Sequence, residues 1–178
     1  TLTLLAGTDS TGNFIRLRSD IANANIQGQY RLTDLGSIIQ NSIEPYFAVT
    51  PPETADTTQQ YDFSFDADVV YTPILSSFVP GLTTMETLHA EGNFATGRGM
   101  NAIVTTPYIL YNGNEISDLN LRANTSDSGL HVTGTAARVK QGNSIDLYNP
   151  KINATALQNN IDFTFGVDDQ NAKEKYAL

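Results

Sequence analysis

Alternation of apolar and polar residues with a period of two is the feature that most limits what this chain can fold into. From 22 to 32 every even-numbered residue is apolar or small, and every odd-numbered one is Asn, Gln or Arg. The same alternation returns at Tyr61–Val69, Leu88–Phe94, Leu130–Ala136 and Ile161–Val167. Successive side chains of a strand point to opposite faces of a sheet, so each segment predicts a half-buried strand. No β-α-β rhythm separates these segments, and we therefore expect an all-β, mostly antiparallel fold.

Local signals refine this expectation around residue 115. Asn112–Gly113 is typical of a two-residue hairpin turn, because both residues tolerate a positive φ. Ile116 differs in parity from Leu119 and Leu121. A strand keeps its apolar set on one face across such a change only by a local irregularity, so we predict a bulge near Ser117–Asp118.

Two segments break the strand pattern with helical features. The first runs from Leu35 to about Tyr46, with Asp34 or Thr33 as the N-cap, and its apolar stripe is expected to pack against the sheet. The residues assigned to this helix packing are Leu35, Ile38, Ile39, Ile43 and Phe47. The second is a short helix at about 73–79, with Thr72 as the N-cap and Pro80–Gly81 as the stop.

Composition excludes several classes of function. The chain has 178 residues, which suits a single β-rich domain spanning 1–178, and the net charge is −9 with only ten Lys and Arg. Such a chain gains nothing from neutralising phosphates, so no nucleic-acid partner is expected. Without cysteine there is no disulfide scaffold and no thiolate site. TLTLLAGTDS begins as if already inside a strand, so we expect the chain to be a piece excised from a longer protein.

Residues able to carry catalysis or bind a metal are few and scattered. His89 and His131 fall on the polar faces of predicted strands, as do Asp62, Asp66 and Asp68. Alternate acidic residues on a strand usually form its solvated side, and no nucleophile, phosphate-binding or EF-hand motif is present. We therefore expect neither an enzyme nor a cofactor or metal site.

The apolar faces of the strands leave two architectures open. They can be hidden against each other in a closed β-sandwich or barrel, which as a function suggests a cell-surface binding or adhesion module. Alternatively they can line a curved sheet whose inner face stays partly open. Periodicity alone does not separate the two.

A resemblance to a known family favours the open sheet. The strand SDIANANIQGQYRL feeding the helix TDLGSIIQNSIEPYF, followed by YDFSFDADVV, PILSSFVPGL, LHAEGNF and the late NNIDFTFGVDD, resembles the C-terminal domain of the TamB family. This family belongs to the AsmA-like superfamily, and the resemblance is strongest to members from Bacteroidota. It covers nearly the whole chain as an order of elements.

The resemblance implies a U-shaped (β-taco) sheet with an apolar groove and no catalytic residues. It further implies a long periplasmic protein anchored in the inner membrane and reaching the outer membrane, where an Omp85-class protein is its partner. The implied roles are phospholipid transport between the membranes and assembly of outer-membrane proteins. The acyl chains of phospholipids are then the ligand. The residues expected to line the lipid-binding groove are Ile26, Tyr30, Phe63, Phe65, Val69, Leu88, Phe94, Leu121, Leu130, Val132, Leu147, Ile161, Phe163 and Phe165.

Overall fold

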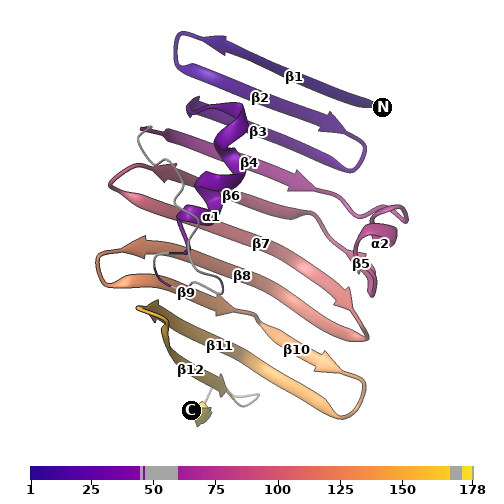
Figure 1. Cartoon of the computed structure of the whole chain (residues 1–178). Helices are drawn as coiled ribbons and strands as arrows, with labels where there is room; N and C mark the ends of the chain where they lie inside the picture. Colours follow the sequence, from indigo (N-terminus) through magenta and orange to yellow (C-terminus); the bar gives the residue numbers. More distant parts are fainter. Residues whose placement is uncertain (45, 47–59, 169–173, 178) are drawn as a thin grey trace.

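The strands of the chain form one curved, antiparallel sheet (Figure 1). A computed structural model of the chain describes residues 1–44, 46, 60–168 and 174–177. In these residues the sheet has 13 strands, in the order β1-β2-β3-β4-β6-β7-β8-β10-β11-β12-β13. Two strands lie off this path, because β5 pairs with β7 and β9 pairs with both β8 and β11. The predicted all-β, mostly antiparallel class is confirmed, and the strands do not divide into the two layers of a sandwich.

The elements follow one another along the chain with short connections. The strands of the first half are β1 Leu2–Asp9, β2 Gly12–Ser19, β3 Ala22–Gln29, β4 Asp62–Val69, β5 Leu82–Met85 and β6 Leu88–Ala95. Those of the second half are β7 Gly99–Tyr111, β8 Asn114–Ser126, β9 Gly129–Thr135, β10 Arg138–Gln141, β11 Ile145–Leu157, β12 Asn160–Asp168 and β13 Glu174–Ala177. The helices are α1 Leu35–Asn41, preceded by a 3-10 turn at Leu32–Asp34, and α2 Leu75–Phe78. In Figure 1, α1 lies in front of the sheet at one end of the strands and α2 lies at the opposite end.

Both predictions around residue 115 are confirmed. Asn112 and Gly113 have φ values of 48° and 74°, as a two-residue turn between β7 and β8 requires. Asp118 has a φ of 51°, which is left-handed, and it drops out of the ladder between the pairs Thr106–Leu119 and Tyr108–Ser117. This irregularity separates the two parities that the sequence shows.

The interruption at Asp118 is one of four that stand side by side in neighbouring strands. We call them the kink line: Pro107 in β7, Asp118 in β8, Ala137 between β9 and β10, and Asn149 in β11. Ala137 donates its N–H to Ser117 O at 2.9 Å, and Asn149, with a φ of 45°, donates its N–H to Ala137 O at 3.0 Å. Interruptions of this kind bend a strand, so the four strands bend together along one line.

Helix α1 packs on one end of the sheet through a narrower face than the sequence predicts. Ile38 is buried, with 7% of its surface exposed, and Leu35 is half-buried in the same cluster. Ile39 is 46% exposed and Ile43 is also exposed, so their assignment to the packing stripe is wrong. The helix ends at Asn41, and positions 35, 38 and 42 face the sheet, with Ser42 buried in place of Ile43. Phe47 lies outside the described residues.

This difference predicts unequal effects of two neighbouring substitutions. Ile38→Ala should lower the free energy of unfolding by about 2–5 kcal/mol, because it leaves a cavity beneath α1. Ile39→Ala should change it by less than about 0.5 kcal/mol, because that side chain is already largely in water. Denaturant titration of both variants measures the difference, and equal losses would show that the wider stripe packs after all.

Candidate functional site: an open apolar face

One face of the sheet carries a row of apolar residues that crosses ten strands without interruption. Its members are joined by the strand register, each being the direct partner of the next across a ladder. This first row consists of Leu4, Leu17, Ala24, Ala67, Ala90, Val104, Leu121, Gly134, Ile152 and Phe165. Directly opposed residues of neighbouring strands stand on the same face, so the row is one continuous apolar strip.

A second row runs beside the first, two residues along each strand and therefore on the same face. It consists of Ala6, Ile15, Ile26, Phe65, Gly92, Ala102, Ala123, Val132, Ala154 and Phe163. Neither row contains a charged or a hydrogen-bonding side chain. We refer to this side of the sheet as the apolar face.

Beyond the kink line the apolar row continues with the opposite parity. Met85, Ile109, Ile116, Val139 and Leu147 are successive partners across β5, β7, β8, β10 and β11. The charged residues of the same strands occupy the alternate row, where Arg138 binds Asp146 through two contacts of 2.7 Å. The left-handed residues of the kink line thus shift the parity and keep apolar side chains together.

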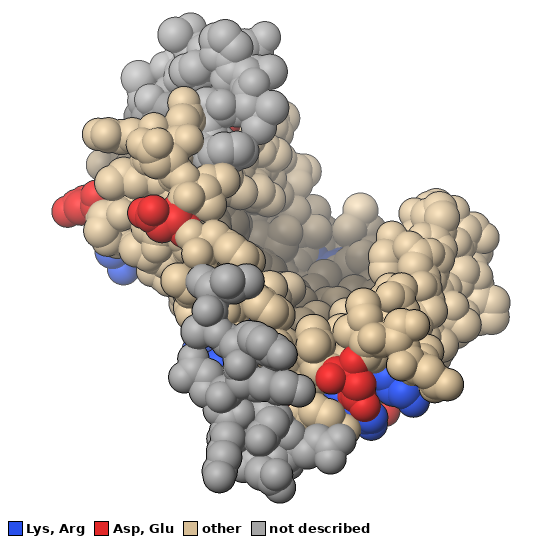
Figure 2. Space-filling view, turned by 90° about the horizontal axis from the view of Figure 1, so that it is seen from below, with Lys and Arg blue, Asp and Glu red and all other residues tan. Residues whose placement is uncertain are grey.

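The intervening rows of the sheet are polar and form its other face. One of them reads Thr3, Arg18, Asn23, Asp68, His89, Thr105, Asn120, Thr135, Lys151 and Gly166. Figure 2 shows a hollow between two walls, with almost no Lys, Arg, Asp or Glu lining it and the charged residues gathered outside. The sheet therefore separates charge from apolar surface across its thickness.

Much of the apolar face is left open by the described residues. Leu121 in β8 and Ile152 in β11 lie inside the sheet, yet their exposed fractions are 39% and 40%. An apolar side chain on an inner strand keeps such exposure only when no second layer covers it. The closed β-sandwich is thus not the architecture of the described strands.

The end of the apolar face beneath α1 is different, because it forms a small closed core. Tyr30, Ile38, Phe63, Phe94 and Met100 are all buried there. The ring centroids of Phe63 lie 5.3 Å from Tyr30 and 5.2 Å from Phe94, so the aromatic side chains stack in series. Burial raises the pKa of the Tyr30 hydroxyl, which keeps it neutral.

The residues predicted to line a groove divide between these two environments. Tyr30, Phe63 and Phe94 lie in the core under α1 and line no open surface. The others lie in the rows of the apolar face, half-buried or exposed: Ile26, Phe65, Val69, Leu88, Leu121, Leu130, Val132, Leu147, Ile161, Phe163 and Phe165. Their sharing of one face confirms the parity read from the sequence.

Small residues in the middle of the apolar face are missing from the predicted set. Ala24, Ala67 and Ala90 are consecutive partners in the first row. Gly92 lies where a Cβ would come within 2.8 Å of the Phe65 ring and closer still to the Asn101 carbonyl oxygen. Alternation places these positions on the apolar face, but their small size draws no attention in a search for greasy side chains.

Thr106 is a second residue that the sequence does not single out. It is only 1% exposed, and its hydroxyl donates to the carbonyl oxygens of Glu86 at 3.3 Å and Tyr108 at 3.2 Å. These bonds span Pro107, which has no N–H of its own to donate. Thr106 therefore stabilises the kink line at its first strand.

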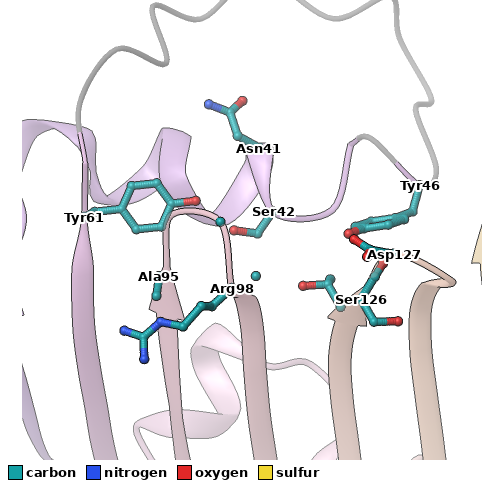
Figure 3. Close-up of a pocket in the computed structure, with 11 residues that line it drawn as sticks. Asn41, Ser42, Tyr46, Tyr61, Ala95, Arg98, Ser126 and Asp127 are labelled. Atoms are coloured by element: carbon teal, nitrogen blue, oxygen red, sulfur yellow. Dashed lines mark hydrogen bonds between the residues drawn. The ribbon is translucent and has the colours of Figure 1, made fainter.

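A polar pocket lies apart from the apolar face, between the end of α1 and the turns that follow β6 and β8 (Figure 3). Tyr46 donates its hydroxyl to Ser126 O at 3.2 Å, and Arg98 forms an ion pair with Asp62. Ser42 also faces the pocket, but its hydroxyl donates to Ile38 O. No histidine is among its described lining residues, so they supply no base for a serine nucleophile.

The two histidines lie in polar rows, as predicted. Asp68 accepts a hydrogen bond from His89 Nδ1 at 2.9 Å and, together with Glu91, raises the pKa of His89. His131 contacts the hydroxyls of Ser128 and Thr155. Among the described residues no group of three or more His, Asp or Glu side chains is placed to hold a metal ion. The chemistry that these residues support is contact with apolar ligands.

Comparisons of the chain with protein-family models, with curated proteins and with solved structures gave no match. The function must therefore be argued from the apolar face itself. Within the described part of the chain, no helix has the length and hydropathy needed to cross a membrane.

Proposed function

We propose that the chain is a lipid-conducting module whose open apolar face holds the acyl chains of phospholipids and lets them move across the strands. The observation that carries this proposal is the pair of uncharged rows spanning ten strands and left uncovered. At about 4.8 Å between strands, the rows extend over roughly 40 Å. A globular protein rarely leaves so long an apolar strip in water unless a ligand uses it.

The energetics of the apolar face suit a ligand that binds and also moves. Each methylene group removed from water contributes about 0.8 kcal/mol, so a long acyl chain is held by many small, equal terms. Movement from one strand to the next exchanges one apolar contact for another of the same kind. No charged or hydrogen-bonding group along the two rows would hold the ligand at one position.

The cell-envelope setting is part of the proposal and is supported by the resemblance to the TamB family. In that setting the chain belongs to a periplasmic bridge, anchored in the inner membrane and working with an Omp85-class partner. Transport of phospholipid, assembly of outer-membrane proteins, or both, then use the apolar face. We propose no catalytic step, because the functional surface has no reactive group.

Photo-crosslinking at neighbouring positions of one strand tests the proposal directly. A benzophenone side chain placed at Leu121, Ile152 or Phe163 should capture phospholipid in cells. The matched controls are the adjacent residues Arg122, Asn153 and Asp162, which lie on the polar face and should give at least tenfold fewer adducts. Mass spectrometry of the purified chain measures the yield, and equal yields at the two sets would refute the proposal.

A further inference from the structure

The segment Val69–Met85, which contains α2, is the longest exposed part of the chain to lack any charge. Its 17 residues include no Asp, Glu, Lys, Arg or His, although the chain has a net charge of −9. We call the exposed part of this segment the α2 tip, which consists of Val70, Ile74, Phe78 and Val79. Figure 1 places α2 beyond the strand ends, at the side of the sheet opposite α1.

The α2 tip turns its largest side chains outward in a defined way. Phe78 is 76% exposed and Ile74 is 54% exposed, and the two are one helical turn apart. On the inward side Ser76 donates its hydroxyl to Leu82 O at 2.8 Å and contacts the Tyr71 hydroxyl. The polar groups of the segment thus bond to the protein while the apolar ones face outward.

The surroundings of the α2 tip are also uncharged and aromatic. Gly81 O accepts the N–H of Asn112 at 2.9 Å, which places the β7–β8 turn beside it. Residues 99–114, which form β7 and this turn, contain no charge, and Tyr111 is exposed at the end of the strand. Tyrosine and phenylalanine beside uncharged turns are typical of surfaces that enter the boundary of a bilayer.

From this combination we infer that the α2 tip docks the module onto the surface of a neutral, zwitterionic lipid bilayer by inserting Phe78 and Ile74. A stable protein interface needs about 20–30 residues a side, many more than the four of the α2 tip, whereas a bilayer accepts single apolar side chains. The net negative charge disfavours anionic headgroups, which leaves neutral lipid as the partner. The inference deepens the proposed function, because β5 joins the tip to the apolar row at Met85.

Flotation with vesicles of pure phosphatidylcholine tests this docking. The unmodified chain should float with the vesicles, and Phe78→Asp should reduce its partition at least tenfold. Leu32→Asp is the control, because Leu32 is also an exposed apolar residue but lies next to α1, and its partition should change less than twofold. Equal flotation of Phe78→Asp and the unmodified chain would overturn the inference.

A fluorescence measurement reports the same contact without depending on loss of binding. The chain has no tryptophan, so Phe78→Trp places a single reporter in the α2 tip. Its emission should shift to the blue on addition of vesicles and be quenched by brominated lipid, whereas Leu32→Trp should show neither effect. An unchanged Phe78→Trp spectrum would overturn the inference. So would a dimer of the unmodified chain that Phe78→Asp converts to monomer, because the occupant would then be a second copy.

The docking and the proposed function fail separately. Phe78→Asp should bind a soluble 16-carbon fatty acid, in the absence of vesicles, as tightly as the unmodified chain does. If it loses this binding, Phe78 belongs to the apolar face and the docking surface is refuted. If the unmodified chain inserts into vesicles but binds no fatty acid, the proposed conduit is refuted and the docking surface stands.

Discussion

Ile152→Arg is expected to lower the affinity of the chain for a fluorescent 16-carbon fatty acid at least tenfold while the chain stays folded. Ile152 is the direct partner of Phe165 in the first apolar row, and it is partly exposed. A long arginine side chain can lay its stem on the apolar face and reach water with its guanidinium, so the fold tolerates it. An acyl chain in that row would then have to displace a hydrated cation, which costs several kcal/mol.

The control for this prediction lies one residue further along the same strand. Asn153→Arg adds the same charge to β11, but it adds it to the polar face, where Thr133 and Thr164 are the partners. Fatty-acid affinity should change less than twofold, and the melting temperature should follow that of Ile152→Arg within a few degrees. Equal affinities for the two arginine variants would mean that acyl chains do not use the apolar face.

Phe94→Arg is expected to unfold the chain, in contrast to Phe163→Arg. Phe94 is 5% exposed and stacks on Phe63 beneath α1, so arginine there would lose the aromatic contacts and strand a charge in a dry core. Loss of a buried Phe alone costs about 3–5 kcal/mol, a large part of the 5–15 kcal/mol that stabilise an ordinary domain. Circular dichroism at 25 °C should show most of the strand signal lost.

Phe163 provides the comparison, because it belongs to the second apolar row and is mostly exposed near one edge of the sheet. Phe163→Arg should lower the free energy of unfolding by less than about 1 kcal/mol. If both arginine variants unfold the chain, a second layer covers the apolar face. If both stay folded, the cluster under α1 is not the core that the structure shows.

Strand alternation made most of this fold predictable from the sequence. A period of two survives in single segments, and the parity change between Ile116 and Leu119 located the left-handed Asp118. The apolar rows follow from the same parity once the strands are paired in order. Because each row depends on ten local patterns that agree, errors in single strand limits, such as ending β3 at Leu32 instead of Gln29, do not disturb it.

What the sequence did not reveal depends on contacts between distant segments. The stripe Ile38, Ile39 and Ile43 looks uniform on a helical projection, and only the short length of α1 decides that Ile38 alone is buried. The division of the aromatic residues into a covered core and an open face is likewise set by where α1 lies. Thr72 was predicted to cap the second helix, yet its hydroxyl is buried without a partner in the described structure.

The kink line also determines how faithfully the strands find their partners. A slip of one residue in any hairpin would turn the apolar set of that strand to the polar face. Between β7 and β11 such a slip would, in addition, set an interrupted position against a hydrogen-bonded one, leaving backbone groups of both strands without partners. Pro107, Asp118, Ala137 and Asn149 therefore act as registration marks: misaligned pairings of these four strands are penalised twice, once in solvation and once in backbone bonding. A long sheet with repetitive, interchangeable strands is thereby guarded against assembling out of step.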